Sequence, residues 1–198
     1  MRRAAQRRVR RRAELLRAAS KVFSERGYHA ATVADILEAA GVSRGTFYLY
    51  FPSKRAVFEA LVDTMLEHIT DALQRVRVGP GEAPPLVQML DNVDRLLIVV
   101  EEHRHLSLIL LREAVSLDDA LDLKLTSFYE RLSAWLEGAL ELGQTMGLVR
   151  PCDNTLVARL SLGALKEILV HWLTREEAKA RDHVAREILD YILHGVFV

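Results

Sequence analysis

The sequence is poor in cysteine, in proline and in long apolar runs. Its 198 residues include one cysteine, Cys152, so no disulfide can form within the chain. The longest uninterrupted apolar runs, such as residues 96–100, have five residues, whereas a membrane-spanning helix needs about 20. The arginine-rich N-terminus is followed by no apolar stretch of the kind that a secretory signal requires. These absences predict a protein of a reducing, cytoplasmic setting with no membrane partner.

Signals for β-strands are also missing, because no β-branched run alternates between apolar and polar residues. Half of the residues are hydrophobic, and they recur at spacings of three and four, as on amphipathic helices. The pattern predicts an all-α chain of about nine helices. One long helix is expected from Ser53 to about Val76. The clear break after it, residues 77–85, contains three of the five prolines.

The formal net charge of zero hides an asymmetry between the two ends of the chain. Residues 1–55 contain 13 Lys or Arg against 4 Asp or Glu, and residues 56–198 contain 14 against 23. Seven arginines lie between Arg2 and Arg12. A basic N-terminal part on an acidic remainder indicates a polyanion partner at one end, although a solvated charged tail gives the same composition.

Helix-start and helix-stop signals cluster between residues 32 and 54. Thr32 followed by Asp35 is typical of a capping box. Gly41 allows a sharp turn after the short helix that follows, and Ser43 can cap a second one. Two short helices joined by Ala-Gly-Val-Ser predict a helix-turn-helix, whose second helix enters the major groove of DNA.

Polar side chains of this segment are the candidate DNA contacts. Arg44 suits guanine, because its guanidinium matches the O6 and N7 acceptors. The hydroxyls of Thr32, Thr46 and Tyr48, and the ammonium of Lys54, suit phosphate oxygens, which fix register rather than sequence. The full set of candidate contacts is Thr32, Ser43, Arg44, Gly45, Thr46, Tyr48, Tyr50 and Lys54.

The same segment resembles a known family. The pattern T-x-x-x-I-x-x-x-A-G-V-S-x-G-T-F-Y-x-Y-F-x-S-K, which begins at Thr32 and ends at Lys54, is similar to that of TetR-family transcriptional regulators. The resemblance covers about residues 13–60. Leu37 departs from it, since many members have alanine there. The resemblance implies a homodimer, repression in most members, and release from DNA when a small molecule binds the C-terminal part.

Two domains are therefore expected, a helix-turn-helix domain over residues 1–52 and a helical ligand-binding and dimerisation domain over residues 53–198. A two-fold dimer presents two reading helices, so the double-stranded DNA operator should be roughly palindromic. The predicted ligand pocket consists of Met65, Ile69, Leu108, Arg112, Phe128, Tyr129, Trp135 and Trp172. The predicted dimer contact, built from the last two helices, includes Leu165, Ile168, Val184 and Ile188.

Neither a metal site nor a cofactor is expected. His103 and His105 are two residues apart and cannot share a helix face. Cys152 lacks neighbours with ligand spacing, and no nucleophile elbow or phosphate loop is present. The sequence thus favours a regulator over an enzyme. Two alternatives remain: a helical small-molecule carrier or enzyme whose N-terminal hairpin is only structural, and a DNA-binding protein with no effector.

Overall fold

The structure is a computed structural model that describes residues 2–112, 119–175 and 180–196. Within these ranges every regular element is a helix, in agreement with the predicted all-α class. The helices are α1 (Arg2–Ala30), α2 (Val33–Ala40), α3 (Arg44–Tyr48), α4 (Lys54–Ala72), α5 (Pro85–Glu102), α6 (Arg104–Arg112), α7 (Asp119–Thr145), α8 (Asn154–Thr174) and α9 (Arg181–Val196).

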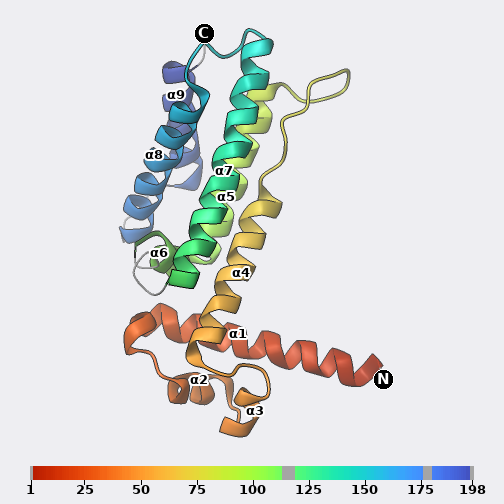
Figure 1. The fold of residues 1–198 in the computed structure, drawn as a ribbon, viewed down its shortest axis with the longest axis vertical. Helices are drawn as coiled ribbons and strands as arrows, with labels where there is room; N and C mark the ends of the chain where they lie inside the picture. The colour runs from red at the N-terminus through yellow and green to blue at the C-terminus, as the bar shows by residue number, and fades with distance from the viewer. Residues whose placement is uncertain (1, 113–118, 176–179, 197–198) are drawn as a thin grey trace.

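Helices α1 to α3 form a small unit at one end, which we call the head (Figure 1). Helix α1 packs against α2, and α2 against α3. Gly27 interrupts α1 with φ of 75°, a left-handed conformation that glycine adopts without a steric penalty. The chain therefore kinks at Gly27, near the C-terminal end of α1.

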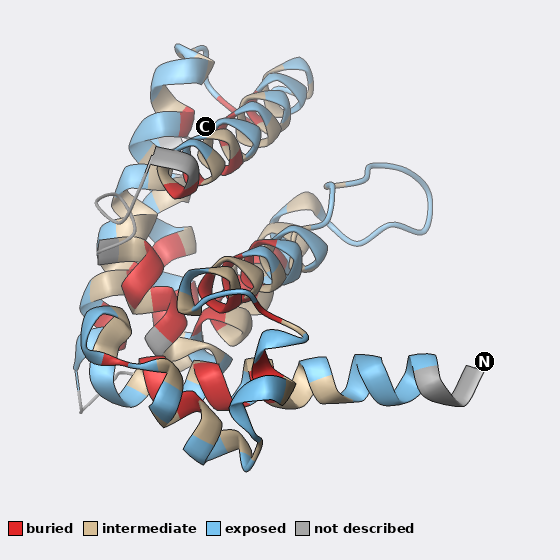
Figure 2. Ribbon diagram, turned by 60° about the horizontal axis from the view of Figure 1, so that its bottom comes forward, coloured by how far each residue is buried: buried red, intermediate tan, exposed pale blue. Residues whose placement is uncertain are grey.

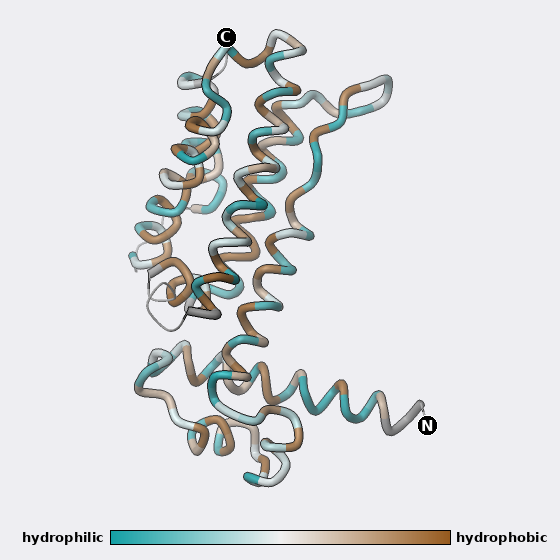
Figure 3. Tube along the Cα trace, in the orientation of Figure 1, coloured by the Kyte–Doolittle hydropathy of each residue, from teal (hydrophilic) through white to brown (hydrophobic). Residues whose placement is uncertain are grey.

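Helices α4 to α9 form an elongated bundle, which we call the body (Figure 1). In the body α7 packs against α8 and α5 against α9, while α4 runs directly from the head into it. Apolar and polar residues interchange along these helices (Figure 3). This interchange gives each helix a face that can be buried against its neighbours.

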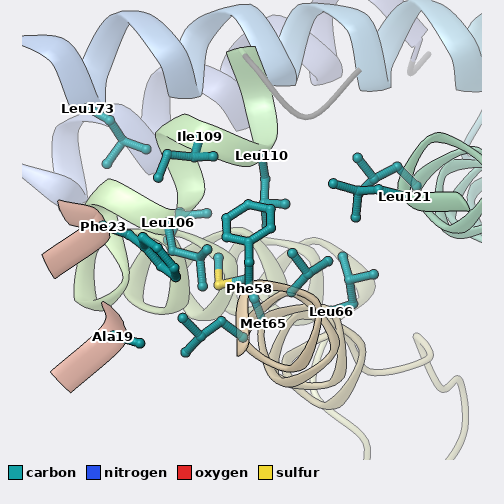
Figure 4. Close-up of a cluster of buried hydrophobic side chains, with 14 of the residues drawn as sticks. Ala19, Phe23, Phe58, Met65, Leu66, Leu106, Ile109, Leu110, Leu121 and Leu173 are labelled. Atoms are coloured by element: carbon teal, nitrogen blue, oxygen red, sulfur yellow. The ribbon is translucent and has the colours of Figure 1, made fainter. Parts of the chain in front are cut away.

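One apolar core connects the head to the body. Phe23 of α1 and Phe58 of α4 lie against Leu106, Ile109 and other buried residues of α6 (Figure 4). The two aromatic rings meet edge to face, with centroids 5.6 Å apart. The buried cluster includes residues on both sides of residue 52, so the core is continuous across the predicted domain boundary at 52/53. The boundary itself stays a prediction.

Helix α4 ends earlier than predicted. Its last residue is Ala72, and Leu73 is already extended. The buried side chain of Asn92 on α5 accepts a hydrogen bond from the backbone N–H of Gln74 at 2.9 Å and donates one to its carbonyl at 2.7 Å. This amide replaces the helical partners of Gln74, which explains why the apolar spacing up to Val76 does not continue as helix.

The N-terminal half of α1 projects away from the head (Figure 1). Between residues 5 and 12 its side chains are exposed or half-buried (Figure 2). No helix among the described residues is long and apolar enough to cross a membrane.

Candidate DNA-binding surface and ligand cavity

The start of α2 is fixed by the capping box that the sequence predicts. The Thr32 hydroxyl accepts from the Asp35 N–H at 3.2 Å, and the Asp35 carboxylate accepts from the Thr32 N–H at 2.8 Å. The hydroxyl also donates to that carboxylate at 2.7 Å. The donor of Thr32 is therefore engaged within the head, and its predicted bond to phosphate would require it to leave Asp35.

The Thr32 hydroxyl and backbone N–H, followed by Arg26 at 3.0 Å, lower the pKa of the Asp35 carboxyl. A carboxyl with a lowered pKa in the folded state stabilises the fold above its ordinary pKa. That contribution is lost as the pH falls through the lowered value.

The turn between α2 and α3 places α3 at the outer edge of the head (Figure 1). Gly41 takes φ of 62°, and the Ser43 hydroxyl accepts from the Thr46 N–H at 3.3 Å, so both predicted signals are confirmed. Phe47 is fully buried and holds α3 onto the head. Gly45 faces open space, where a Cβ would meet nothing within 4 Å. The fold does not require a glycine there, which fits a surface that another molecule approaches closely.

Three exposed side chains of this edge are available for contact. Arg44 is exposed, and its guanidinium lies 6.0 Å from the centre of the Tyr48 ring. Tyr48 is 45% exposed, whereas Tyr50 is half-buried and packs on the core. Sequence reasoning missed Leu49, which is 74% exposed beside them. Such an apolar side chain suits the methyl group of thymine, and its only sequence signal is its place directly after α3.

Lys54 is engaged inside the head rather than aimed at solvent. Its ammonium donates to the carbonyl oxygens of Tyr28 at 2.8 Å, His29 at 3.3 Å and Ala31 at 2.8 Å. It also lies 4.6 Å from the centre of the Tyr28 ring. An ammonium has three donors, so the structure gives Lys54 a capping role at the end of α1 in place of the predicted phosphate contact.

Replacing Lys54 by alanine is expected to lower the free energy of unfolding by about 1–3 kcal/mol, because carbonyl groups lose charged donors. Thermal and urea unfolding measure this. The salt dependence of DNA binding should stay unchanged, with Lys21→Ala as the control for an exposed lysine of α1. A salt slope lowered by about one unit, with normal stability, would restore the phosphate contact.

A cavity lies within the body between α4, α5, α7, α8 and α9, with a volume of about 210 Å³. Its wall is almost entirely apolar, and Ile69, Trp135 and Leu165 contribute to it. A smaller cavity of about 70 Å³ adjoins it and shares Ile69, Leu96 and Leu165. One side of this apolar space is thus formed by α4, which is the next helix after α3 in the chain.

The predicted pocket residues fall into three groups. Five of them line one or both cavities, namely Met65, Ile69, Phe128, Tyr129 and Trp135. Leu108 and Trp172 do not, because Leu108 lies on another face of α6 and Trp172 lies nearly one turn beyond the last lining residue of α8. The side chain of Arg112 lies outside the described residues. Sequence analysis did not predict that α5 contributes to the cavity wall, through residues that include Met89 and Val93.

The four predicted dimer residues lie against the chain's own body, and their place in a dimer contact stays a prediction. Leu165, Ile168 and Ile188 line the larger cavity, and Val184 is 8% exposed within the core. The apolar spacing of α8 and α9 correctly indicated burial. It could not tell burial in the same chain from burial against a second one.

A different face of α8 carries exposed leucines. Leu156 is 55% and Leu160 63% exposed, and the two lie about one turn apart on the same side. Gly163, also exposed, extends that side. On α9, Tyr191 is 68% exposed. Large apolar side chains left in solvent on the last two helices favour a protein contact there.

Comparison with known proteins yields matches over most of the chain. Residues 15–61 match the bacterial regulatory proteins of the tetR family, and residues 82–196 match a tetracyclin repressor-like C-terminal domain. The transcriptional regulator YdgC of Bacillus subtilis is 46% identical over 198 residues, which cover 93% of this chain and 92% of that protein. The transcriptional repressor KstR2 of Mycolicibacterium smegmatis is 28% identical over 190 residues, 94% and 90% of the two chains.

A solved structure supports the architecture. The regulator FadR of Bacillus subtilis, in complex with stearoyl-CoA, superposes with a TM-score of 0.76 at 21% identity, over 92% of this chain and 98% of that one. Likeness at this identity establishes the fold.

Proposed function

Because the chain belongs to the TetR family of bacterial regulatory proteins and is thus a DNA-binding transcriptional regulator, we propose that it is a repressor released by a small apolar or amphipathic molecule. One observation carries the proposal. Helix α4 forms part of the wall of the apolar cavity, and it is the next helix in the chain after α3 of the head. Among its relatives, KstR2 is a transcriptional repressor, and FadR is a transcriptional regulator solved in complex with stearoyl-CoA.

In this proposal α3 enters the major groove and Arg44 reads guanine, while Tyr48 and Thr46 bind phosphates. The projecting part of α1 adds contacts outside the groove. Its arginines Arg7, Arg8 and Arg10 are exposed. Arg12, at its base, lies 5.2 Å from the centre of the Phe51 ring, close to the end of α3. Arginines beside the reading helix can bind flanking phosphate or the minor groove.

We further propose a homodimer formed by the exposed leucine face of α8 together with α9. Two helices from each chain make a four-helix contact. The two heads would then read a roughly palindromic operator. We place the protein in the cytoplasm and assign it no catalytic role, since its relatives are regulators.

The effector would act by moving α4. A molecule in the cavity that presses on Ile69 shifts α4 and with it the distance between the two heads. Such a ligand changes DNA affinity only through its unequal affinity for the two conformations. The apolar wall favours a ligand with a long hydrocarbon part, and the stearoyl-CoA bound by FadR suggests long-chain acyl compounds as first probes.

Calorimetry with stearoyl-CoA and palmitate, each with and without operator DNA, tests the effector. We expect DNA to weaken binding of the active ligand about 5–150-fold, and the ligand to weaken DNA binding equally, because the coupling is reciprocal. Ala139→Phe fills the cavity and should abolish the ligand effect while leaving operator binding intact. Ala134→Phe, at an exposed site of the same helix, is the matched control. Equal ligand affinities with and without DNA would contradict the role of that ligand as an inducer.

A further inference from the structure

Two histidines that are far apart in the sequence meet where α4 lies beside the C-terminal end of α5. His68 lies on α4, and His103 is the C-cap residue directly after the last residue of α5. The Nδ1 atom of His68 is 3.3 Å from the Nε2 atom of His103. Their ring centroids are 5.3 Å apart, and the ring planes differ by 32°. The DNA-reading surface and the apolar cavity make no use of this pair.

We propose that His68 Nδ1 and His103 Nε2 bind a divalent transition-metal cation of the zinc type, with water completing its coordination. Two nitrogens at 2.0–2.1 Å from one zinc ion, at the tetrahedral angle, lie about 3.3 Å apart. The separation of the two nitrogens in this structure therefore already matches the spacing required of two ligands on one ion. Imidazole is a ligand that suits zinc, copper and nickel.

The protonation of the two rings is compatible with this role. Partial burial, followed by the neighbouring His68, lowers the pKa of His103, which favours the neutral ring that a metal needs. In the metal-free pair one nitrogen donates to the other. When a cation binds, that proton can move to the outward nitrogen of the same ring, so both lone pairs face the cation without loss of a proton. The Glu102 carboxylate is near enough to act electrostatically on His103, and its charge attracts a cation.

The proposed site has two protein ligands, and this number limits its affinity for the cation. Among the described residues no group of three or more His, Cys, Asp or Glu side chains is arranged to hold a metal ion. A two-histidine site leaves the remaining positions to water. It is therefore exchangeable and weaker than the four-ligand sites that hold structural zinc.

A cation at this point would join α4 to the end of α5. Helix α6 begins at the next residue and packs against α1 of the head. The cation would thus restrain the movement of α4 on which the proposed effector acts, from outside the apolar cavity. Binding of the cation does not depend on the proposed effector response, so failure of one leaves the other unaffected.

Titration of the full-length, chelator-treated protein with zinc chloride in a calorimeter tests the site. We expect one binding event that His68→Gln and His103→Gln each weaken by about 10–100-fold or more, since even changes outside the ligand shell have effects of that size. His171→Gln, at an exposed histidine of α8, is the control and should bind like the unmodified chain. Circular dichroism melting of each variant checks that it is folded.

Nitrogen-15 NMR of the histidine side chains gives a second readout on the unmodified protein. Added zinc should shift His68 Nδ1 and His103 Nε2 together, at the same stoichiometry as the heat of binding. Absence of binding at 100-fold excess of zinc, or unchanged binding in the double variant, would overturn the proposal. Shifts confined to other histidines would do the same.

Discussion

A chain with Leu156→Glu and Leu160→Glu is expected to be monomeric and to bind its operator about 10²–10⁴-fold more weakly, because a linked second head multiplies affinity to that extent. Both leucines lie on the exposed side of α8, 55% and 63% accessible in the single chain. In the proposed dimer they meet their counterparts near the two-fold axis. Four carboxylates buried there would repel one another and lose hydration.

Sedimentation velocity gives the oligomeric state, and fluorescence anisotropy with labelled operator gives the affinity. Leu123→Glu, at a 69% exposed leucine of α7, is the matched control and should remain dimeric. Glutamates at Leu165 and Ile168 should instead unfold the body, because those side chains line its cavity. A dimeric Leu156/Leu160 variant would place the dimer contact elsewhere.

Replacing Arg44 by alanine is expected to weaken operator binding by about 1–3 kcal/mol per half-site and to relax the base preference at one position. Arg44 opens α3, where side chains of a reading helix reach base edges. Its exposed guanidinium beside Tyr48 lies at the outer edge of the head. Binding to random DNA should change much less, because the loss is one of base contact.

Anisotropy titrations with operator, single-base variants and random duplex measure both effects. Arg131→Ala, which removes an exposed arginine of α7 from the body, is the control and should leave all affinities unchanged. Equal weakening on operator and random DNA would reassign Arg44 to a phosphate.

Local signals allowed the head to be predicted in detail. The capping box of Thr32 and Asp35, the left-handed Gly41 and the cap at Ser43 depend on residues within four positions of one another. Such motifs carry their geometry in the sequence. The positions of α2 and α3, and hence the exposed Arg44, follow from them.

Contacts between distant residues were the part that the sequence could not provide. Lys54 meets carbonyls 23 to 26 residues earlier, so its charge looked available for DNA. Leu165 and Leu160 are both leucines of α8, yet Leu165 faces the cavity and Leu160 faces solvent. Helical spacing gives the apolar positions, while tertiary packing decides what covers each of them.

We expect this chain to read DNA sequence with its head and to release the DNA when the body binds a ligand. The most direct measurement is the affinity of the full-length protein for duplexes tiled across the DNA beside its own coding region, against scrambled duplexes of equal length. We predict one duplex, containing an inverted repeat, bound at least 10³-fold more tightly than its scrambled form at physiological salt, and released by a ligand of the cavity. Equal affinity for all duplexes, matched at every salt concentration, would contradict sequence-specific reading by the head.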